Sequence, residues 1–122
     1  MGVFMIRLNS YKDKIERDIT NYRLVDTTRQ NLIGRCCIKN NKITNCNEIW
    51  SLMIATQFRR KGYATLMLKR IIAKYKSMRL PLVLYVYKDN DIAIKLYEKL
   101  GFKITQEQTC TICKMERKYG GQ

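Results

Sequence analysis

The spacing of apolar residues along this chain alternates between that of strands and that of helices. Short apolar runs bounded by polar residues predict strands, and they follow one another at 3–8, 22–26, 32–39, 48–56, 82–87, 102–107 and 109–117. The polar stretch TTRQN predicts a hairpin turn between the second and third of these strands. The run LVLYVY is apolar on both sides, which is typical of a central strand covered on both faces.

A short helix is expected between the first two strands, within residues 9–21. Tyr11, Ile15 and Ile19 recur every four residues there, which is the spacing of one helix face. Ser10 followed by Asp13 resembles a capping box at the start of such a helix.

Two longer helices are predicted in the second half of the chain. From residue 63 to 76, apolar and basic residues recur with the helical period, and Pro81 follows as a break. A second helix begins after Asn90, a good N-cap, and ends at Gly101. The strand–helix–strand unit over 48–87 predicts a parallel strand pair with a right-handed crossover.

The length and composition are those of one folded α/β domain over residues 1–122. The chain has 46% hydrophobic and 28% charged residues, which is typical of a globular protein. No apolar run is long enough to span a membrane, and the start MGVFMIRLNS lacks the pattern of a signal peptide. We therefore expect a cytoplasmic or otherwise intracellular, reducing location and no membrane partner.

Cysteine usage agrees with a reducing location, because the chain has five cysteines, an odd number. Cys110 and Cys113 form a CxxC, but in a strand positions three apart point to opposite faces. The chain has no histidine and no second CxxC. Structural thiols are therefore favoured over a metal or redox site, and no metal is expected.

The net charge of +14, from 24 Lys and Arg against 10 Asp and Glu, favours anionic ligands. One interpretation is a nucleic-acid-binding module, with FRRKGYATLMLKRIIAKYK as a basic helix and Tyr85 and Tyr87 stacking on bases. Against it, both tyrosines lie in an otherwise apolar strand, and the chain has no helix-turn-helix or RNA-binding signature.

The stretch QFRRKGYATL lies between a buried strand and an amphipathic helix. The first N–H groups of a helix lack partners, and the helix dipole is positive there. Gly62 allows close approach to the backbone, and Arg59, Arg60 and Lys61 add full charges. These residues are expected to bind a pyrophosphate. On their own they are equally compatible with a solvated surface turn.

A second motif further along the chain favours the phosphate interpretation. Asn90 and Ala93, followed by LYEKLGF at 96–102, match a run found in GCN5-related N-acetyltransferases (GNAT). The same family carries Arg/Gln-x-x-Gly-x-Gly/Ala where this chain has residues 59–64, although Arg60 replaces a frequent glycine. With Leu52 and Ile54 as the preceding Leu-x-Val positions, the chain resembles the GNAT superfamily over about residues 22–117.

The resemblance implies an enzyme that transfers an acetyl group from acetyl-CoA to a primary amine. It implies a mixed sheet with flanking helices, in which the parallel strands 48–56 and 82–87 splay apart around the cosubstrate. The residues that it places at acetyl-CoA are Leu52, Met53, Ile54, Arg59, Arg60, Lys61, Gly62, Tyr63, Ala64, Asn90 and Tyr97.

The resemblance also suggests the catalytic groups. Tyr97 is expected to protonate the leaving thiolate, the alternative being a core aromatic residue. Glu48 is expected to deprotonate the amine directly or through water, the alternative being a surface glutamate at a strand edge. The Ile54 N–H is the natural donor to the oxyanion. A GNAT fold that binds CoA without catalysis is a further alternative, against which the presence of Tyr97 argues.

The region before the second strand departs from the family. GNAT proteins usually place two helices there, but only residues 9–21 are available. The acceptor pocket is therefore expected to be open, or shaped by a partner or by a second subunit in a homodimer. The acceptor is a peptide or a small molecule, and the net charge favours a neutral or acidic one. A local acidic patch of Glu48, Asp89 and Asp91 would oppose that preference.

Overall fold

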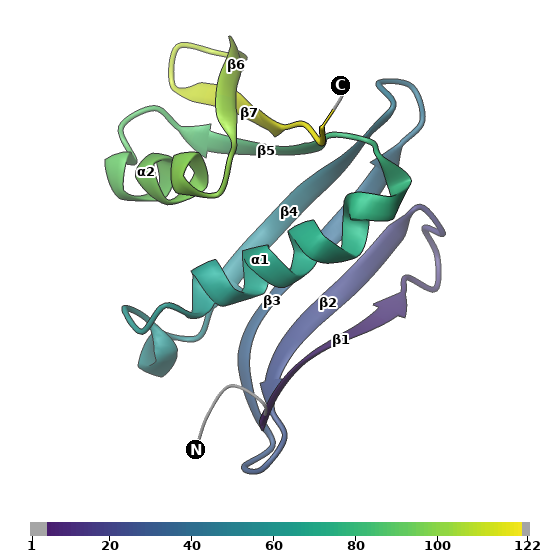
Figure 1. Ribbon diagram of the computed structural model, residues 1–122, viewed down its shortest axis with the longest axis vertical. Helices are drawn as coiled ribbons and strands as arrows, with labels where there is room; N and C mark the ends of the chain where they lie inside the picture. The colour runs from purple at the N-terminus through teal and green to yellow at the C-terminus, as the bar shows by residue number, and fades with distance from the viewer. Residues whose placement is uncertain (1–4, 121–122) are drawn as a thin grey trace.

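The structure is a computed structural model that describes residues 5–120, in which seven strands form one mixed sheet (Figure 1). The strands are β1 (Ile6–Lys12), β2 (Ile19–Asp26), β3 (Asn31–Asn41), β4 (Cys46–Ile54), β5 (Leu82–Tyr87), β6 (Lys103–Glu107) and β7 (Ile112–Arg117). Their order across the sheet is β1-β2-β3-β4-β5-β7-β6. Among the described strands, β4 and β5 pair in parallel. All other neighbouring strands of the sheet pair antiparallel. The expected α/β fold with a parallel central pair is confirmed.

Both long helices form where their periodicity predicts them. They are α1 (Tyr63–Tyr75) and α2 (Asp91–Lys99), with short 3₁₀ turns η2 (Thr56–Phe58) before α1 and η3 (Lys76–Met78) after it. The Asn90 side chain accepts a hydrogen bond of 3.2 Å from the N–H of Ala93 and so caps α2. Gly101 adopts φ +96° just after that helix. Within residues 5–120, no helix is both long and apolar enough to cross a membrane.

The short helix expected within 9–21 is absent, and β1 and β2 form a hairpin instead. The Asp13 carboxylate accepts hydrogen bonds from the N–H groups of Ile15 and Glu16, at 3.1 and 2.9 Å. This side chain closes a tight turn in place of a helical one. Ile15 is 90% exposed at the tip of that turn, so the four-residue apolar spacing did not mark a buried helix face.

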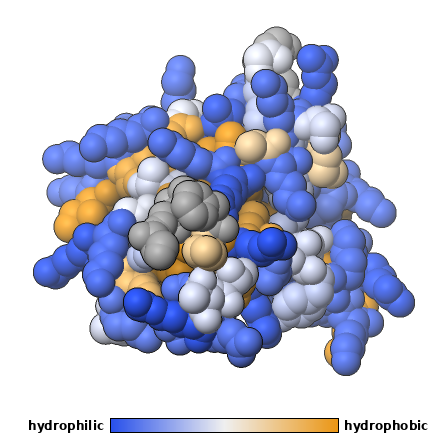
Figure 2. Space-filling view, turned by 60° about the horizontal axis from the view of Figure 1, so that its bottom comes forward, coloured by the Kyte–Doolittle hydropathy of each residue, from blue (hydrophilic) through white to orange (hydrophobic). Residues whose placement is uncertain are grey.

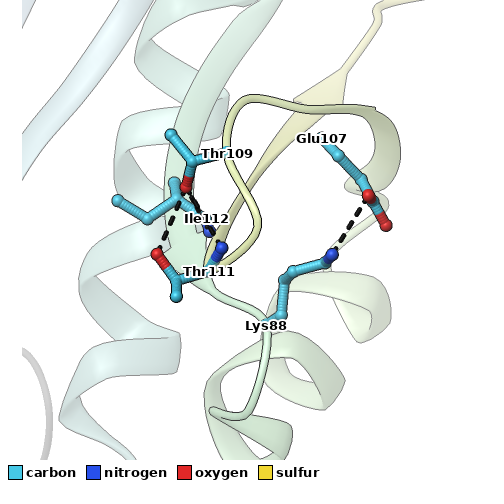
Figure 3. Close-up of polar contacts among 5 residues, drawn as sticks. All are labelled: Lys88, Glu107, Thr109, Thr111 and Ile112. Carbon is cyan, nitrogen blue, oxygen red and sulfur yellow. Dashed lines mark hydrogen bonds and ion pairs between the residues drawn. The ribbon is translucent and has the colours of Figure 1, made fainter.

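Several strand boundaries differ from the expected ones; β2, for example, begins at Ile19 and not at residue 22. Residues 3 and 4 of the first expected strand lie outside the described residues, and β1 continues to Lys12. The last strand begins at Ile112, because the Thr109 hydroxyl accepts hydrogen bonds from the N–H groups of Thr111 and Ile112 and forms a turn (Figure 3). An ion pair between Lys88 and Glu107, 3.0 Å long, ties this β6–β7 turn to the end of β5.

The hydrophobic core lies between one face of the sheet and the two helices. Met67, Leu68 and Ile71 of α1 are fully buried against β-strand side chains. A hydrogen bond of 2.7 Å joins the hydroxyls of Tyr22 and Tyr75, and Arg70 donates to the carbonyl oxygen of Ile6 at 2.7 Å. These contacts hold α1 across β1 to β4, as Figure 1 shows.

No helix of the described chain covers the opposite face of the sheet. We call this the open face; it carries Tyr11, Arg23, Arg35, Trp50 and Tyr85, which follow from the strand registers and from ring contacts. The expectation that LVLYVY is covered on both sides holds only at the start of β5. On the open-face side Val83 is 0% exposed, whereas Tyr87 is 61% exposed. Polar residues dominate the surface seen from the lower end of the molecule, with small apolar patches between them (Figure 2).

β4 and β5 stay paired over a very short distance. Their register contains only Asn47 opposite Leu82 and Glu48 opposite Val83. β4 then carries one extra residue relative to β3, and Ser51 adopts φ +57° at this bulge. Because a bulge bends its strand and increases its twist, β4 leaves β5 here, and the two strands diverge in Figure 1.

A close contact behind the bulge leads to a stability prediction. A Cβ atom on Gly34 would lie 2.6 Å from the Ile54 side chain and 2.9 Å from the Met53 carbonyl oxygen. Because that backbone oxygen cannot rotate away, we expect Gly34→Ala to lower the free energy of unfolding by about 1–3 kcal/mol. Denaturant titration followed by circular dichroism measures the loss. Gly120→Ala is the control, because its Cβ would meet nothing within 4 Å; equal stability of the two variants would contradict the prediction.

Candidate active site

The exposed edge of β4 faces the space that β5 leaves. Ile54 pairs with Gly34 of β3, and the next residue, Ala55, donates its N–H to the Ile33 carbonyl oxygen at 2.7 Å. Hydrogen-bonded and non-hydrogen-bonded pairs alternate in an antiparallel ladder. The N–H and C=O of Ile54 therefore point away from β3, into the gap. Arg59 Nε donates to that carbonyl oxygen at 2.8 Å, and the N–H stays directed into the gap.

The turn after β4 presents the start of α1 to the same gap. Gly62 is the N-cap residue, with φ +84°, and it has no side chain that could cap the first N–H groups of the helix. The first turn of α1 contains no acidic residue. Arg60 also adopts a left-handed backbone, with φ +62°, at the position where GNAT proteins frequently have glycine. Free N–H groups, the positive end of the helix dipole and two arginines together favour an anion.

Tyr97 of α2 stands on the other side of the gap. Its ring packs edge-on against Phe102, with centroids 6.1 Å apart. Burial raises the pKa of the Tyr97 phenol above its ordinary value. The hydroxyl is therefore protonated at neutral pH and can act as a proton donor.

These three elements enclose a cleft of about 610 Å³, which we call the wedge cleft. The expected cosubstrate residues that line it are Leu52, Met53, Ile54, Arg59, Arg60, Gly62, Tyr63, Ala64 and Tyr97. Residues from β4, from the turn, from α1 and from α2 thus meet at one site, although up to 45 positions separate them in the sequence.

The sequence interpretation missed some of the cleft's walls, which are Phe58, Thr65, Ile92 and Leu96. Phe58 packs edge-on against Tyr63, with ring centroids 5.9 Å apart, and so shapes the turn. Ile92 and Leu96 lie four residues apart on one side of α2, and Ile92 is 85% exposed. An apolar residue that breaks the polar side of a helix was the available signal.

Three expected site residues do not line the wedge cleft. Lys61 is exposed in the turn, and the Asn90 side chain is engaged in capping α2. Glu48 lies where β4 and β5 are still paired, before the strands diverge.

A family model for "Acetyltransferase (GNAT) family" matches residues 4–102 of the chain. The chain belongs to the GNAT acetyltransferase family. The expectation of an acyltransferase is thereby confirmed at the level of the family. A search of curated protein sequences finds no match.

Solved structures of acetyltransferases share the fold of this GNAT chain. A spermidine N-acetyltransferase from Vibrio cholerae in complex with CoA and spermine has a TM-score of 0.72 and 22% identity, covering 81% of this chain and 64% of its own. Arabidopsis thaliana NAA60 in complex with a bisubstrate analogue has a TM-score of 0.70 and 17% identity, covering 86% of this chain and 78% of its own. At these identities the likeness concerns the fold.

The cysteines of this GNAT chain are all free thiols. Cys110 is exposed in the β6–β7 turn, whereas Cys113 is buried in β7. The two members of the CxxC therefore lie in different environments. Within residues 5–120, no three His, Cys, Asp or Glu side chains are grouped as metal ligands would be.

Glu48 is held firmly beside the open face. It is 8% exposed, and its carboxylate accepts hydrogen bonds from Asn41 Nδ2 at 3.1 Å and from Trp50 Nε1 at 3.0 Å. The Trp50 ring stacks on Tyr85, with centroids 5.1 Å apart. Burial, followed by the nearby charge of Glu48, raises the pKa of the Tyr85 phenol. Glu48 is thus a buried, hydrogen-bonded carboxylate and not a loosely solvated surface glutamate.

This arrangement predicts that Glu48 contributes to stability. Glu48→Ala leaves the Asn41 and Trp50 donors without their acceptor, and Glu48→Gln turns an amide donor toward one of them. Since an unsatisfied buried donor costs about 1–3 kcal/mol, we expect both variants to lose about that much free energy of unfolding. Chemical denaturation measures the change. Glu98→Gln, on the exposed side of α2, is the control and should stay within about 0.5 kcal/mol. Unchanged stability in both Glu48 variants would refute the structural role.

Proposed function

We propose that the chain is an N-acetyltransferase that transfers the acetyl group of acetyl-CoA to a primary amine by direct attack. The observation that carries the proposal is the wedge cleft. It joins an unpaired strand edge, an uncapped helix N-terminus with two arginines and a protonated tyrosine in one site. The family assignment supports this reaction class.

The wedge cleft has separate places for the two ends of acetyl-CoA. The N–H groups of residues 60–64, with the side chains of Arg59 and Arg60, receive the pyrophosphate at the start of α1. The N–H of Arg59 itself donates to the Thr56 carbonyl oxygen at 3.3 Å. The edge of β4 around Leu52 to Ile54 receives the pantetheine amides, because its backbone groups on that side lack a partner strand. Lys61 and Asn90 lie outside the cleft lining, and we assign them supporting roles: added charge and the placement of α2.

The chain's own groups then act on the thioester. The Ile54 N–H donates to the carbonyl oxygen as it gains negative charge, a donation that stabilises the transition state. The amine nitrogen bonds to the carbonyl carbon, and the bond from that carbon to sulfur breaks. The Tyr97 hydroxyl gives its proton to the sulfur as the carbon–sulfur bond breaks. A phenol is a weaker acid than a thiol, whose ordinary pKa is about 8.5, so the phenolate left on Tyr97 readily takes up a proton again. Bulk water reprotonates Tyr97.

Through water, Glu48 accepts the proton that the ammonium of the acceptor loses before its nitrogen attacks. The Glu48 carboxylate is engaged by Asn41 and Trp50 and lies outside the wedge cleft. A bridging water is the route that these positions favour. An α-amino group, with a pKa of about 7.7–8.0, is deprotonated more easily than a lysine side chain. A weak base such as the Glu48 carboxylate is therefore sufficient for it.

The acceptor is a neutral or acidic amine, peptide or small molecule. A domain with a net charge of +14 repels polycations within a Debye length of about 8 Å. Lys69 and Lys74 are exposed on α1 and stay charged when the wedge cleft is filled. Asp89 and Asp91 lie just before and at the start of α2, whereas Glu48 lies in β4.

Calorimetry with acetyl-CoA tests the cosubstrate site. We expect Gly62→Asp to weaken binding by roughly 100-fold or more, since bringing like charges together costs several kcal/mol. Gly62→Asn is the matched control. Asn and Asp have the same shape and both tolerate positive φ, so the difference between the two variants isolates the charge. A folded Gly62→Asp protein that binds acetyl-CoA as the wild type does would refute the assignment.

The same titration distinguishes the nucleic-acid alternative. A short duplex and a single strand are titrated at the salt concentration used for acetyl-CoA, because phosphate contacts are strongly salt-dependent. Tight binding of either nucleic acid without binding of acetyl-CoA would overturn the proposed function.

Tyr97→Phe tests the general acid. The substitution keeps the buried ring and removes the proton, so we expect kcat to fall by about 10²–10⁴ while acetyl-CoA affinity stays close to that of the wild type. Steady-state kinetics with the best acceptor, over a range of pH, measure both quantities. Tyr87→Phe, at an exposed tyrosine, is the control. A kcat within a few-fold of the wild type and an unchanged pH profile would show that another group supplies the proton.

A further inference from the structure

A second cavity, of about 330 Å³, opens on the other side of β4 from the first turn of α1. We call it the arginine pocket. Side chains from four neighbouring strands surround it, and its lining includes Tyr11, Arg23, Leu32, Arg35, Cys37 and Ser51. It belongs to the open face, which no helix of the described chain covers. The cosubstrate site does not use it.

Arg23 and Arg35 stand directly opposite each other in the β2–β3 ladder. Cβ atoms of directly opposite residues lie about 5 Å apart, and like charges in such positions destabilise a sheet. Arg23 lies over the Tyr11 ring, 5.2 Å from its centroid, and its guanidinium is 3.4 Å from the Tyr11 hydroxyl. Arg35 touches the Met53 sulfur at 4.0 Å. The two cations thus have only weak, neutral partners, and an anion between them would remove their repulsion.

No carboxylate of the described residues forms an ion pair with either arginine. The ion pair found among the described residues joins Lys88 and Glu107, outside the arginine pocket. Asp13 lies close enough to affect the Cys37 thiol. However, its own carboxylate is engaged by the N–H groups of Ile15 and Glu16 and by the Asn21 side chain. These neutral donors leave the negative charge of Asp13 in place near the arginine pocket, but no carboxylate of the described residues forms an ion pair with Arg23 or Arg35.

The arginine pocket adjoins the wedge cleft across a single strand. Ser51 lines the pocket, and the next residue, Leu52, lines the cleft. Met53 lines the cleft and also contacts Arg35. A ligand in the pocket is thus next to the point of β4 at which the acetyl group would react.

We propose that Arg23 and Arg35 bind a carboxylate of the acceptor, so that this chain selects peptides whose N-terminal amine is followed by an acidic side chain. The inference rests on the proposed function and names its acceptor class. Two guanidinium groups on facing strands can form charge-assisted, forked hydrogen bonds with one carboxylate. A peptide fits better than a free amino acid, because the amine must reach the wedge cleft while the carboxylate stays in the pocket.

A panel of matched peptides tests the proposal. The peptides differ only at the residue after the N-terminus, which is acidic, neutral or basic, and kcat/KM is measured for each at low and high salt. We expect the wild type to prefer the acidic peptide, and Arg23→Gln/Arg35→Gln to lower the acidic-to-neutral ratio about tenfold or more. Lys69→Gln/Lys74→Gln removes the same charge from the exposed side of α1. It weakens only the long-range field, so it should lower this ratio much less, and only at low salt.

A charge reversal makes the test independent of loss of folding. Arg35→Glu is expected to favour the basic peptide over the acidic one, a gain that a misfolded protein does not produce. Acetyl-CoA affinity and melting temperature are measured for each variant. Wild-type preference for neutral or basic peptides, transfer to no peptide despite acetyl-CoA binding, or an equal change in both double variants would overturn the inference. Failure of the wild type to bind acetyl-CoA would instead overturn the proposed function.

Discussion

The extra residue in β4 at Ser51 is the constraint on which both sites depend. β4 and β5 pair only at Asn47 and Glu48, and the bulge follows within three residues. A continuous parallel ladder would bury the edge of β4 in backbone hydrogen bonds with β5. The bulge instead turns the Ile54 N–H into a gap that a ligand can fill, and it brings Ser51 to the rim of a cavity on the other face. One backbone irregularity thus lies between the wedge cleft, the proposed cosubstrate site, and the arginine pocket, the proposed acceptor site.

Sequence patterns predicted the elements whose signals are long and redundant. The helix at Tyr63–Tyr75 combines many turns of periodicity with a basic start, and α2 combines the Asn90 cap with the Gly101 stop. Most motif residues around these helices line one cleft, although Lys61 and Asn90 do not. The hairpin turn at Asp13 was missed because three apolar residues at a four-residue spacing are a weak signal, and a single carboxylate can close a turn. Pairing across strands, such as Arg23 opposite Arg35, has no local sequence signal at all.

Two groups of positively charged side chains lie apart, one at the start of α1 and one on the open face of the sheet. One group of cations meets the free N–H groups at the start of α1, where a pyrophosphate would be held by backbone and side chains together. The other group, Arg23 and Arg35, lies on the open face without a carboxylate partner in the described chain. If the charged residues served only solubility, we would expect positive and negative side chains to alternate over the surface. Two concentrated, unneutralised sites on either side of one strand favour two anionic groups on two different substrates.

The composition of the open face distinguishes a substrate surface from an apolar interface with a second subunit. Large apolar contact areas between subunits are depleted in charged residues at their centres. Here the centre holds two arginines, and the nearby aromatic rings are already paired, Tyr11 under Arg23 and Trp50 on Tyr85. Glu48 is buried beside the Trp50 ring. Its carboxylate accepts hydrogen bonds from Asn41 and Trp50, which offset the cost of that burial. A flat apolar partner would have to desolvate these arginines without neutralising them, at a high cost in free energy. A small anionic ligand neutralises them and leaves most of the face in water, so the charge of this face favours an acidic acceptor over a second subunit.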